Sequence, residues 1–235
     1  MNILLTNDDG YFSEGINLLK RKLIKYGRVV IVAPKVSTSA KSFGITYGVP
    51  NHIEKIEEDV YSFDGLPSDC VAFAISMLDI DFDLVVSGCN HGFNISNDVM
   101  QSGTLGACLF AINYHKKTVA FSCDFNFEIV DKYFDEVFNF ILNNNLLSDK
   151  YTLNVNFPVG DTVKDIKLGR LFFREQYTYY EKENGEYFAK RTLQDYHGIS
   201  HDYDCYQVYH QIVSIVPLAP TIFDVSIYRK LKNKK

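Results

Sequence analysis

The sequence of 235 residues has no tryptophan, no Cys-x-x-Cys pair and no uninterrupted apolar run of membrane-spanning length. Its five cysteines are scattered along the chain, which disfavours a disulfide or zinc framework and predicts reduced, buried thiols. A membrane helix needs about 20 predominantly apolar residues, so we expect no membrane association. The short apolar start at residues 2–6 does not resemble a secretory signal. Together these absences predict a cytoplasmic protein.

Basic residues are too few for a broad nucleic-acid-binding surface. The chain has 24 Lys and Arg against 29 Asp and Glu, a formal net charge of −5, whereas proteins that bind a nucleic-acid duplex usually present a basic face. A small anionic ligand is still compatible with this balance, because one bound cation can reverse the local field. The composition, 46% hydrophobic and 23% charged, is ordinary for a globular protein.

Short apolar runs alternate with helix-length segments through the first two-thirds of the chain. Strand-sized runs occupy residues 3–5, 29–33, 60–63, 84–86, 118–121 and 153–157. The run at 29–33 is continuously β-branched or small, as in strands buried on both faces of a parallel sheet. Helical patterns occupy residues 16–24, 69–78, 105–114 and 133–141. This alternation predicts an α/β fold with a mostly parallel sheet.

The pattern changes at about residue 164, where aromatic-rich, charged segments begin. Asn184-Gly185 lies between two of them and predicts a β-hairpin. A polar stretch at 194–204 precedes the β-branched run 212–216, and the basic end at 230–235 is expected to fray. Because no linker or repeat separates this part, we predict a single domain over 1–235. Its core covers about 1–163, and its C-terminal hairpin and arm cover about 164–235.

Three polar loops follow predicted strands, which is where ligands bind in open parallel sheets. They cover residues 7–13, 34–44 and 87–104. In the first, Gly10 relaxes the backbone so that Asp8 and Asp9 can turn toward one point. Two carboxylates about 4 Å apart repel by roughly 4 kcal/mol at an effective dielectric of about 20, and a cation between them converts that repulsion into binding. The alternative is a solvated turn with an Asp capping the next helix.

The other two loops supply neutral oxygen atoms and an anion-binding helix start. Hydroxyls such as Ser39 can complete an oxygen ligand shell, although most serine-rich loops bind nothing. In the third loop, Asn90 offers an amide oxygen and Asn94 can bind substrate or brace the loop; the start of a helix at residues 102–104 favours anions. The alternative is a capped surface loop. Carboxylate, hydroxyl and amide ligands suit Mg²⁺, Mn²⁺ or Ca²⁺ better than zinc.

The chain resembles the SurE family, the stationary-phase survival proteins, a group of metal-dependent nucleotidases. The resemblance rests on blocks in family order at residues 5–10, 32–42, 64–70, 85–94, 102–104, 153–158 and 214–218. The segment Tyr11–Glu14 departs from the family, which usually has a smaller segment with Ala-Pro there. Ala40, Val216 and Pro220 also depart from it. These departures bear on substrate preference and rate more than on the reaction.

The resemblance implies a Rossmann-like three-layer core and a C-terminal β-hairpin and arm that serve oligomerisation. It implies one divalent cation per subunit, Mg²⁺ or Mn²⁺, with Ca²⁺ possible in a crystal. The ligand positions correspond to Asp8, Asp9, Ser39 and Asn90. The implied reaction is hydrolysis of nucleoside 5′-monophosphates, and of 3′-monophosphates as a further activity. Exchanged C-terminal arms would make the protein a homodimer or homotetramer.

In the mechanism that follows from this resemblance, a metal-activated water attacks phosphorus. Asp8 or Asp9 takes its proton. The expected phosphate-binding residues are Asn7, Ser42, Asn94, Ser102, Gly103 and Thr104. His91 fits a loop brace better than a reacting group.

Two other functions compete with this one. A Rossmann oxidoreductase is disfavoured because no G-x-G-x-x-G follows the first strand. A non-catalytic nucleotide-binding regulatory module with the same pocket stays open, since binding and turnover use the same groups.

Overall fold

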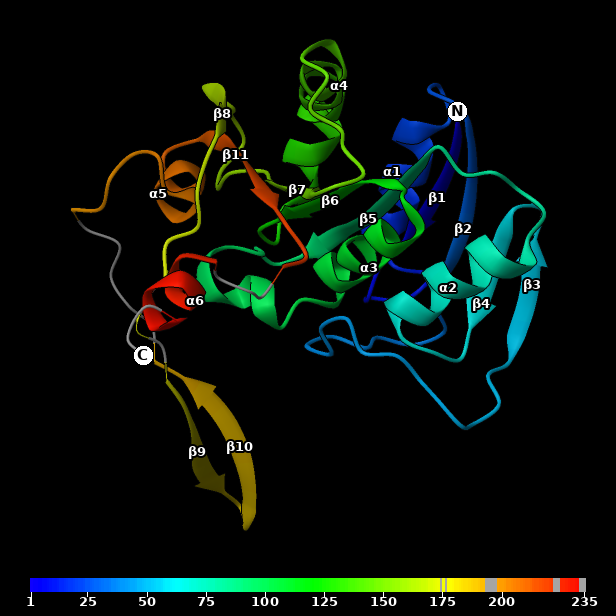
Figure 1. Ribbon diagram of the computed structural model, residues 1–235, viewed down its shortest axis with the longest axis horizontal. Coiled ribbons are helices and arrows are strands. Elements are labelled where there is room, and N and C mark those ends of the chain that lie inside the picture. Colours follow the sequence, from blue (N-terminus) through cyan, green and yellow to red (C-terminus); the bar gives the residue numbers. More distant parts are fainter. Residues whose placement is uncertain (174, 176, 193–197, 222–224, 233–235) are drawn as a thin grey trace.

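A nine-stranded β-sheet forms the centre of the molecule (Figure 1). The computed structural model describes residues 1–173, 175, 177–192, 198–221 and 225–232. In spatial order the strands are β3 (Ile53–Glu57), β4 (Val60–Phe63), β2 (Arg28–Pro34), β1 (Asn2–Thr6), β5 (Leu84–His91), β6 (Lys117–Cys123), β7 (Thr152–Asn156), β11 (Ile212–Leu218) and β8 (Asp165–Leu168). All neighbours from β4 to β7 pair in parallel, and so do β11 and β8. The β3–β4 and β7–β11 pairs are antiparallel. The predicted mostly parallel sheet is confirmed.

Helices cover both faces of this sheet, which gives the predicted three layers (Figure 1). On one face lie α1 (Glu14–Leu23) and α4 (Phe127–Asn143), whose buried side chains share a core with the strands. On the other face lie α2 (Pro67–Met77) and α3 (Gly103–Ala111). Small residues on α3, such as Ala107 and Ala111, let that helix pack close to the sheet. The α/β fold class predicted from the sequence is therefore confirmed.

The sheet has one hydrophobic core on each face, because the side chains along each strand alternate between the two faces. In β1, Ile3 and Leu5 point into the core under α1 and α4, while Leu4 points into the core under α2 and α3. Successive side chains of a strand point to opposite faces, so a strand buried on both faces must be apolar throughout. All five cysteines are free and buried, as predicted.

Strand β5 is longer than the apolar run that predicted it. It continues through His91, because its pairing with β6 resumes at Asn90 after a register shift that follows Ser87. A bulge of this kind redirects side chains near the end of a strand. The first part of the predicted 87–104 loop is thus the end of a strand, and residues Ser96–Met100 form the 3-10 helix η1. A second 3-10 helix, η2 (Ile112–Tyr114), follows α3.

The edge strands β3 and β8 were not predicted, because most of their side chains are exposed and show no apolar pattern. The short helix α5 (Asp204–Tyr209) begins where the predicted polar stretch ends, and residues 194–197 of that stretch lie outside the described residues. The prediction of a frayed end is wrong for residues 230–232, which belong to helix α6 (Val225–Lys232), while 233–235 lie outside the described residues. No helix in the described ranges is long and apolar enough to cross a membrane.

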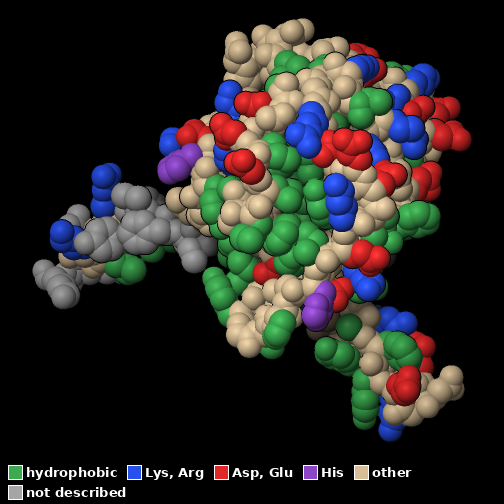
Figure 2. Space-filling model, turned by 90° about the vertical axis from the view of Figure 1, so that its right-hand side faces the viewer, with side chains coloured by type: hydrophobic (Ala, Val, Ile, Leu, Met, Phe, Trp, Pro, Cys, Tyr) green, Lys and Arg blue, Asp and Glu red, His purple; other side chains and the backbone are tan. Residues whose placement is uncertain are grey.

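The predicted hairpin is confirmed as a separate two-stranded sheet of β9 (Thr178–Glu183) and β10 (Glu186–Arg191). Asn184 and Gly185 both have positive φ, 51° and 91°, as a type I′ turn requires. The hairpin projects away from the body (Figure 1), and Figure 2 shows the same projection at the bottom. On the face seen in Figure 2, acidic and basic side chains are interspersed.

Candidate active site

The pocket that collects most of the predicted site residues lies at the carboxyl ends of β1, β2 and β5. Because β1 pairs in parallel with both β2 and β5, the loops that leave these strands begin side by side. The cavity has a volume of about 220 Å³. Six predicted residues line it: Asp8, Asp9, Ser39, Asn90, Asn94 and Ser102. The usual ligand-binding edge of a parallel sheet is therefore where these side chains meet.

Asp8 is a buried carboxyl group, with 3% of its surface exposed. Thr104 Oγ1 donates a hydrogen bond to Asp8 Oδ1 over 2.5 Å, and the backbone of Gly103 contributes another hydrogen bond. Burial, helped by the charge of Asp9, raises the pKa of Asp8 to about 6 despite these bonds. A positive charge beside this carboxyl would favour its ionised form.

Asp9 is less buried and less constrained. Its Oδ2 accepts a long hydrogen bond, 3.4 Å, from the backbone N–H of His91. Burial raises the pKa of Asp9, while the interactions with His91 lower it. The His91 ring packs edge-on against Phe125 and stacks on Phe127, with ring centroids 4.6 and 5.4 Å away. These contacts fit the interpretation of His91 as a brace of its loop.

Two neutral oxygen groups complete the possible ligand set. Asn90 Nδ2 donates to the Gly92 carbonyl over 2.8 Å, and within the described part of the chain Asn90 Oδ1 accepts no hydrogen bond. Ser39 lines the same pocket, with its Oγ 3.0 Å from Ser37 Oγ. Two carboxylates, an amide oxygen and a hydroxyl are the hard donors that Mg²⁺ and Mn²⁺ prefer. The residues present therefore fit a divalent cation of this class.

Four of the predicted phosphate-binding residues do not line the pocket. Asn7 is buried and braces the first loop, with its Nδ2 bonded to the Gly10 carbonyl and to Ser13 Oγ at 3.0 and 2.7 Å. Ser42 Oγ donates to the Met100 carbonyl over 2.9 Å, which ties the second loop to η1. Gly103 and Thr104 contact Asp8 instead. In this structure the four residues shape the pocket from outside it.

Helix α3 begins at the pocket wall. Ser102 is its N-cap, and its Oγ accepts a hydrogen bond from the Leu105 N–H over 3.1 Å. The hydroxyl hydrogen of Ser102 is thereby left for another acceptor. A helix N-terminus carries a partial positive charge, so this end of the pocket favours an anion.

Three β-strand residues hold Asn94 in place, and their role was not deduced from the sequence. Asn94 N–H donates to Asn156 Oδ1 over 2.9 Å, and Asn94 Nδ2 donates to Ser122 Oγ over 2.9 Å. Asn154 Nδ2 and Asn156 Nδ2 both donate to the Asn94 carbonyl, over 2.7 and 3.1 Å. The Asn-x-Asn spacing puts both amides on one face of β7, a signal that could have pointed to a polar partner.

The C-terminal part of the chain also builds the pocket wall. Asp204 is buried and accepts backbone hydrogen bonds from Ser96, Phe172 and Cys205, at 2.6, 3.2 and 2.8 Å. It thereby fixes the start of η1, whose Asp98 lines the pocket. Arg191, from the end of β10, lines the pocket as well. The predicted site set contained none of these C-terminal residues, because nothing local in the sequence links them to the first 104 residues.

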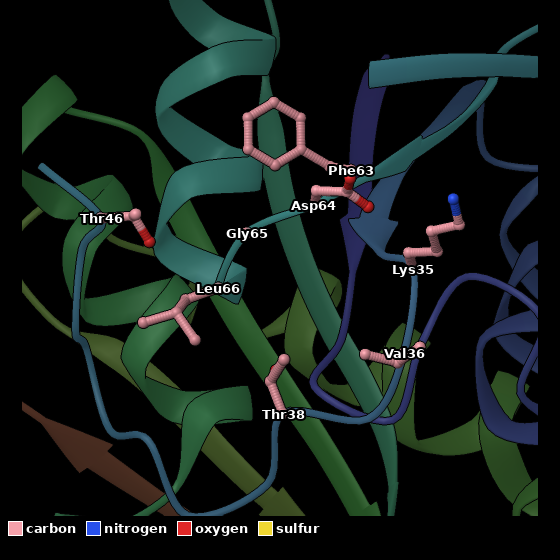
Figure 3. Close-up of a pocket in the computed structure, with 8 residues that line it drawn as sticks. All are labelled: Lys35, Val36, Thr38, Thr46, Phe63, Asp64, Gly65 and Leu66. Carbon is pink, nitrogen blue, oxygen red and sulfur yellow. The ribbon is translucent and has the colours of Figure 1, made fainter. Parts of the chain in front are cut away.

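Two other cavities lack this chemistry. One of about 310 Å³ lies at the carboxyl ends of β2 and β4, with Lys35 and Asp64 toward one end and Thr46 and Leu66 toward the other (Figure 3). One of about 670 Å³ is mostly apolar and is lined by residues such as Phe110. Neither brings paired carboxylates together with amide oxygens. The smaller Asp8–Asp9 pocket is the candidate because of its donor groups.

Known proteins resemble this chain over nearly its full length. The family described as "Survival protein SurE" matches residues 3–178. A relative from Clostridium botulinum strain Alaska E43, named 5′-nucleotidase SurE, is 31% identical and aligns over 100% of this chain and 98% of its own length. A relative of the same name from strain 657 is 34% identical, over 93% and 92%. The crystal structure of the SurE protein from Aquifex aeolicus superposes with a TM-score of 0.87 at 30% identity, covering 100% of this chain and 99% of that one.

Gly103 leaves no room for a larger residue beside Asp8. A Cβ atom at position 103 would lie 2.8 Å from Asp8 Cβ and 2.9 Å from Asp8 Oδ2, closer than real side chains approach. Gly103→Ala should therefore displace the Asp8 side chain and lower the free energy of unfolding by about 1–3 kcal/mol, the usual cost of overpacking. Urea denaturation measures this loss.

The matched control is a double-mutant cycle. In an Asp8→Gly background, the same Gly103→Ala change should cost much less, because the clashing side chain is gone. Equal losses in both backgrounds would show that the close approach of Gly103 to Asp8 is not the cause.

Asp8→Asn should stabilise the cation-free protein at pH 8. Asn keeps the shape of Asp and can still accept the hydrogen bond from Thr104, but it carries no charge. A pKa raised from 3.8 to about 6 means that the folded state binds the Asp8 proton more tightly than the unfolded state. The associated stability is present below about pH 4 and is lost as the pH rises through about 6, a loss of about 3 kcal/mol by pH 8.

Thermal melts in EDTA check this prediction, because each kcal/mol shifts the melting temperature by roughly 2–4 °C in a chain of this size. The advantage of Asp8→Asn should be present at pH 8 and vanish near pH 4. Asp64→Asn, which changes an exposed carboxyl outside this pocket, should have no such effect. A melting temperature of Asp8→Asn at or below that of the unmodified protein at pH 8 would contradict the assignment of a buried charge.

Proposed function

Because this chain belongs to the SurE family, we propose that it is a 5′-nucleotidase, a phosphomonoester hydrolase that releases phosphate from nucleoside monophosphates. One observation carries the proposal: the ends of three parallel strands and the loops that follow them bring Asp8, Asp9, Ser39 and Asn90 to one pocket, beside the N-terminus of α3. Carboxylate and amide oxygens together with a helix start suit a phosphate ester with a cation.

The proposal includes one divalent cation per chain, Mg²⁺ or Mn²⁺, held by Asp8, Asp9, Ser39 and Asn90. The acidic pair, with Asp8 buried and Asp9 partly buried, supports this, because its repulsion and its raised pKa values are both relieved by a positive charge. The acceptor Asn90 Oδ1, which has no partner among the described residues, supports it too. When bound, such a cation would act as a Lewis acid that polarises a phosphoryl oxygen and lowers the pKa of the attacking water.

The two carboxylates have different surroundings, which favours different roles. Asp8 is buried and fixed by Thr104, so its role is to hold charge in a set position. Asp9 is more accessible, and its hydrogen bond to the described residues is the long one from the His91 N–H. We assign to the Asp9 carboxylate the acceptance of the proton from the attacking water.

The phosphoryl group would lie at the start of α3. The Ser102 hydroxyl has a hydrogen free to donate, and Asn94, one Nδ2 hydrogen of which is bonded to Ser122 Oγ, lines the same pocket. The partial charge of the helix N-terminus adds to these donors as negative charge develops on the phosphoryl oxygens. The bonds from Asn154 and Asn156 hold the Asn94 backbone carbonyl, and the bond to Ser122 Oγ orients the Asn94 side chain.

Hydrolysis of 3′-monophosphates belongs to the same proposal. The groups named above would bind the phosphoryl oxygens, and these contacts do not depend on which sugar carbon carries the phosphate. We also propose a homodimer or homotetramer assembled through the C-terminal hairpin and arm. The exposed aromatic side chains of the projecting hairpin, with Tyr180 at 69% and Tyr187 at 67%, support this assembly.

The reaction is tested by incubating the protein with AMP or GMP and Mg²⁺ or Mn²⁺. Free phosphate should appear, and EDTA should abolish its release. Asp9→Ala should lower the rate by at least about 100-fold, the range expected for a positioned base, while circular dichroism shows an unchanged fold.

Asp64→Ala is the matched control, because it removes a carboxylate from the neighbouring cavity of Figure 3; it should retain full activity. Full activity in Asp9→Ala would refute the role of Asp9. Nucleotide binding without phosphate release in the unmodified protein would instead identify a regulatory binding module.

Light scattering coupled to size exclusion tests the assembly. The unmodified protein should have the mass of two or four chains, and Tyr180→Lys with Tyr187→Lys should reduce that mass because charge replaces apolar contact. Tyr47→Lys, at an 85% exposed position in the loop after β2, is the control and should not change it. A monomeric unmodified protein would rule the assembly out.

A further inference from the structure

We propose that Arg191, at the end of hairpin strand β10, binds the phosphoryl group of the substrate from the rim of the Asp8–Asp9 pocket. The inference rests on the proposed phosphohydrolase function and adds a substrate-binding residue from the C-terminal hairpin. Arg191 lines the pocket together with Asp8, Asp9 and Asn90, although it lies about 100 positions or more from each of them in the sequence.

The position of the Arg191 guanidinium is fixed by Asp98. Arg191 Nη1 lies 2.9 Å from Asp98 Oδ1, and both residues line the pocket. On the hairpin side, Arg191 pairs with Thr178, next to the backbone bond from Thr192 N–H to the Tyr177 carbonyl at 3.0 Å. On the pocket side, the Asp98 N–H donates to the Ile95 carbonyl over 3.1 Å in η1. The hairpin thus anchors the backbone at Arg191, and Asp98 pairs with its guanidinium at the rim of the pocket.

The charges of the pocket call for a cation at this place. Three carboxylates line it, Asp8, Asp9 and Asp98, and among the described lining residues Arg191 is the only Lys or Arg. A divalent cation would neutralise the Asp8–Asp9 pair and leave the two charges of a phosphate monoester to be balanced. A guanidinium has five N–H donors in a planar fork, so it can bond to Asp98 and still present donors to a phosphate. Arg191 therefore fits the role of a second phosphate-binding charge.

The side chains of the last two basic residues of the hairpin, Lys190 and Arg191, point in different directions. Lys190 lies beside Arg191 in β10, so their side chains point to opposite faces of the hairpin. Lys190 Nζ pairs with Glu183 Oε1 at 3.0 Å, within the hairpin itself. The two side chains are similarly exposed, 39% for Lys190 and 46% for Arg191. Lys190 is thus a matched control of the same charge on the same strand.

The test compares Arg191→Gln, Arg191→Lys and Lys190→Gln in the full-length protein with Mg²⁺. For Arg191→Gln, the KM for AMP and the competitive inhibition constant for inorganic phosphate should rise together by roughly tenfold to a hundredfold, the factor expected for lost charge-assisted hydrogen bonds. The kcat should fall by no more than the same factor, because a donor to the phosphoryl oxygens also stabilises the charge that develops on them. Arg191→Lys should recover part of the affinity, since it restores the charge without the fork. Lys190→Gln should match the unmodified protein.

Binding of inorganic phosphate, measured by isothermal titration calorimetry, separates this inference from the function on which it rests. Tighter phosphate binding to the unmodified protein than to Arg191→Gln supports the inference even if no nucleotide is hydrolysed, which would overturn only the proposed function. Equal phosphate binding by the two proteins overturns the inference and leaves the function standing. Equal weakening in Arg191→Gln and Lys190→Gln also overturns it, because a loss that is the same for a side chain outside the pocket does not come from a phosphate contact by Arg191.

Discussion

The site depends on the burial of one carboxylate beside another. Asp8 is almost completely covered, and burial together with Asp9 keeps its pKa near 6 even though Thr104 donates a short hydrogen bond to it. An isolated buried charge is unfavourable unless opposite charge or hydrogen bonds offset it. The neighbouring groups offset only part of the cost, so the folded pocket favours a positive charge at the Asp8–Asp9 pair. The affinity proposed for a divalent cation follows from this unfavourable arrangement.

The sheet makes the arrangement possible. The parallel order β2-β1-β5 delivers Ser39, the acidic pair and Asn90 to one edge, although these residues are up to 82 positions apart. The next strands supply the support, because Ser122 and Asn156 at the ends of β6 and β7 hold Asn94 in place. Rigid strands position such groups more accurately than loops alone. The pocket is therefore built by strand ends that also belong to the core.

The parts of the fold and site that follow local rules could be predicted from the sequence. Continuous apolar runs such as 29–33 identified buried parallel strands, and the Asn184-Gly185 pair identified the hairpin turn. The edge strand β8 escaped prediction because its side chains are mostly exposed and carry no period. Asn7, Ser42 and Thr104 were expected to bind phosphate, whereas in the structure their side chains bond to the loops or to Asp8. A polar residue near a strand end can bind a ligand or stabilise its own loop, and the sequence does not distinguish these two roles. The hydrogen-bond partner in the structure does.

The contribution of the C-terminal segment depends on contacts that no local pattern encodes. Asp204 accepts three backbone hydrogen bonds, one of which fixes the start of η1, and η1 carries Asp98, which in turn holds Arg191 of the hairpin. Apart from the bond from the adjacent Cys205, each link joins residues separated by about 30 to more than 100 positions. The hairpin projects from the body, yet its base reaches the pocket through Arg191. Any movement of the hairpin, including one imposed by a second copy of the chain, would therefore shift a charge at the rim of the pocket. Assembly and phosphate affinity would be linked through this single side chain.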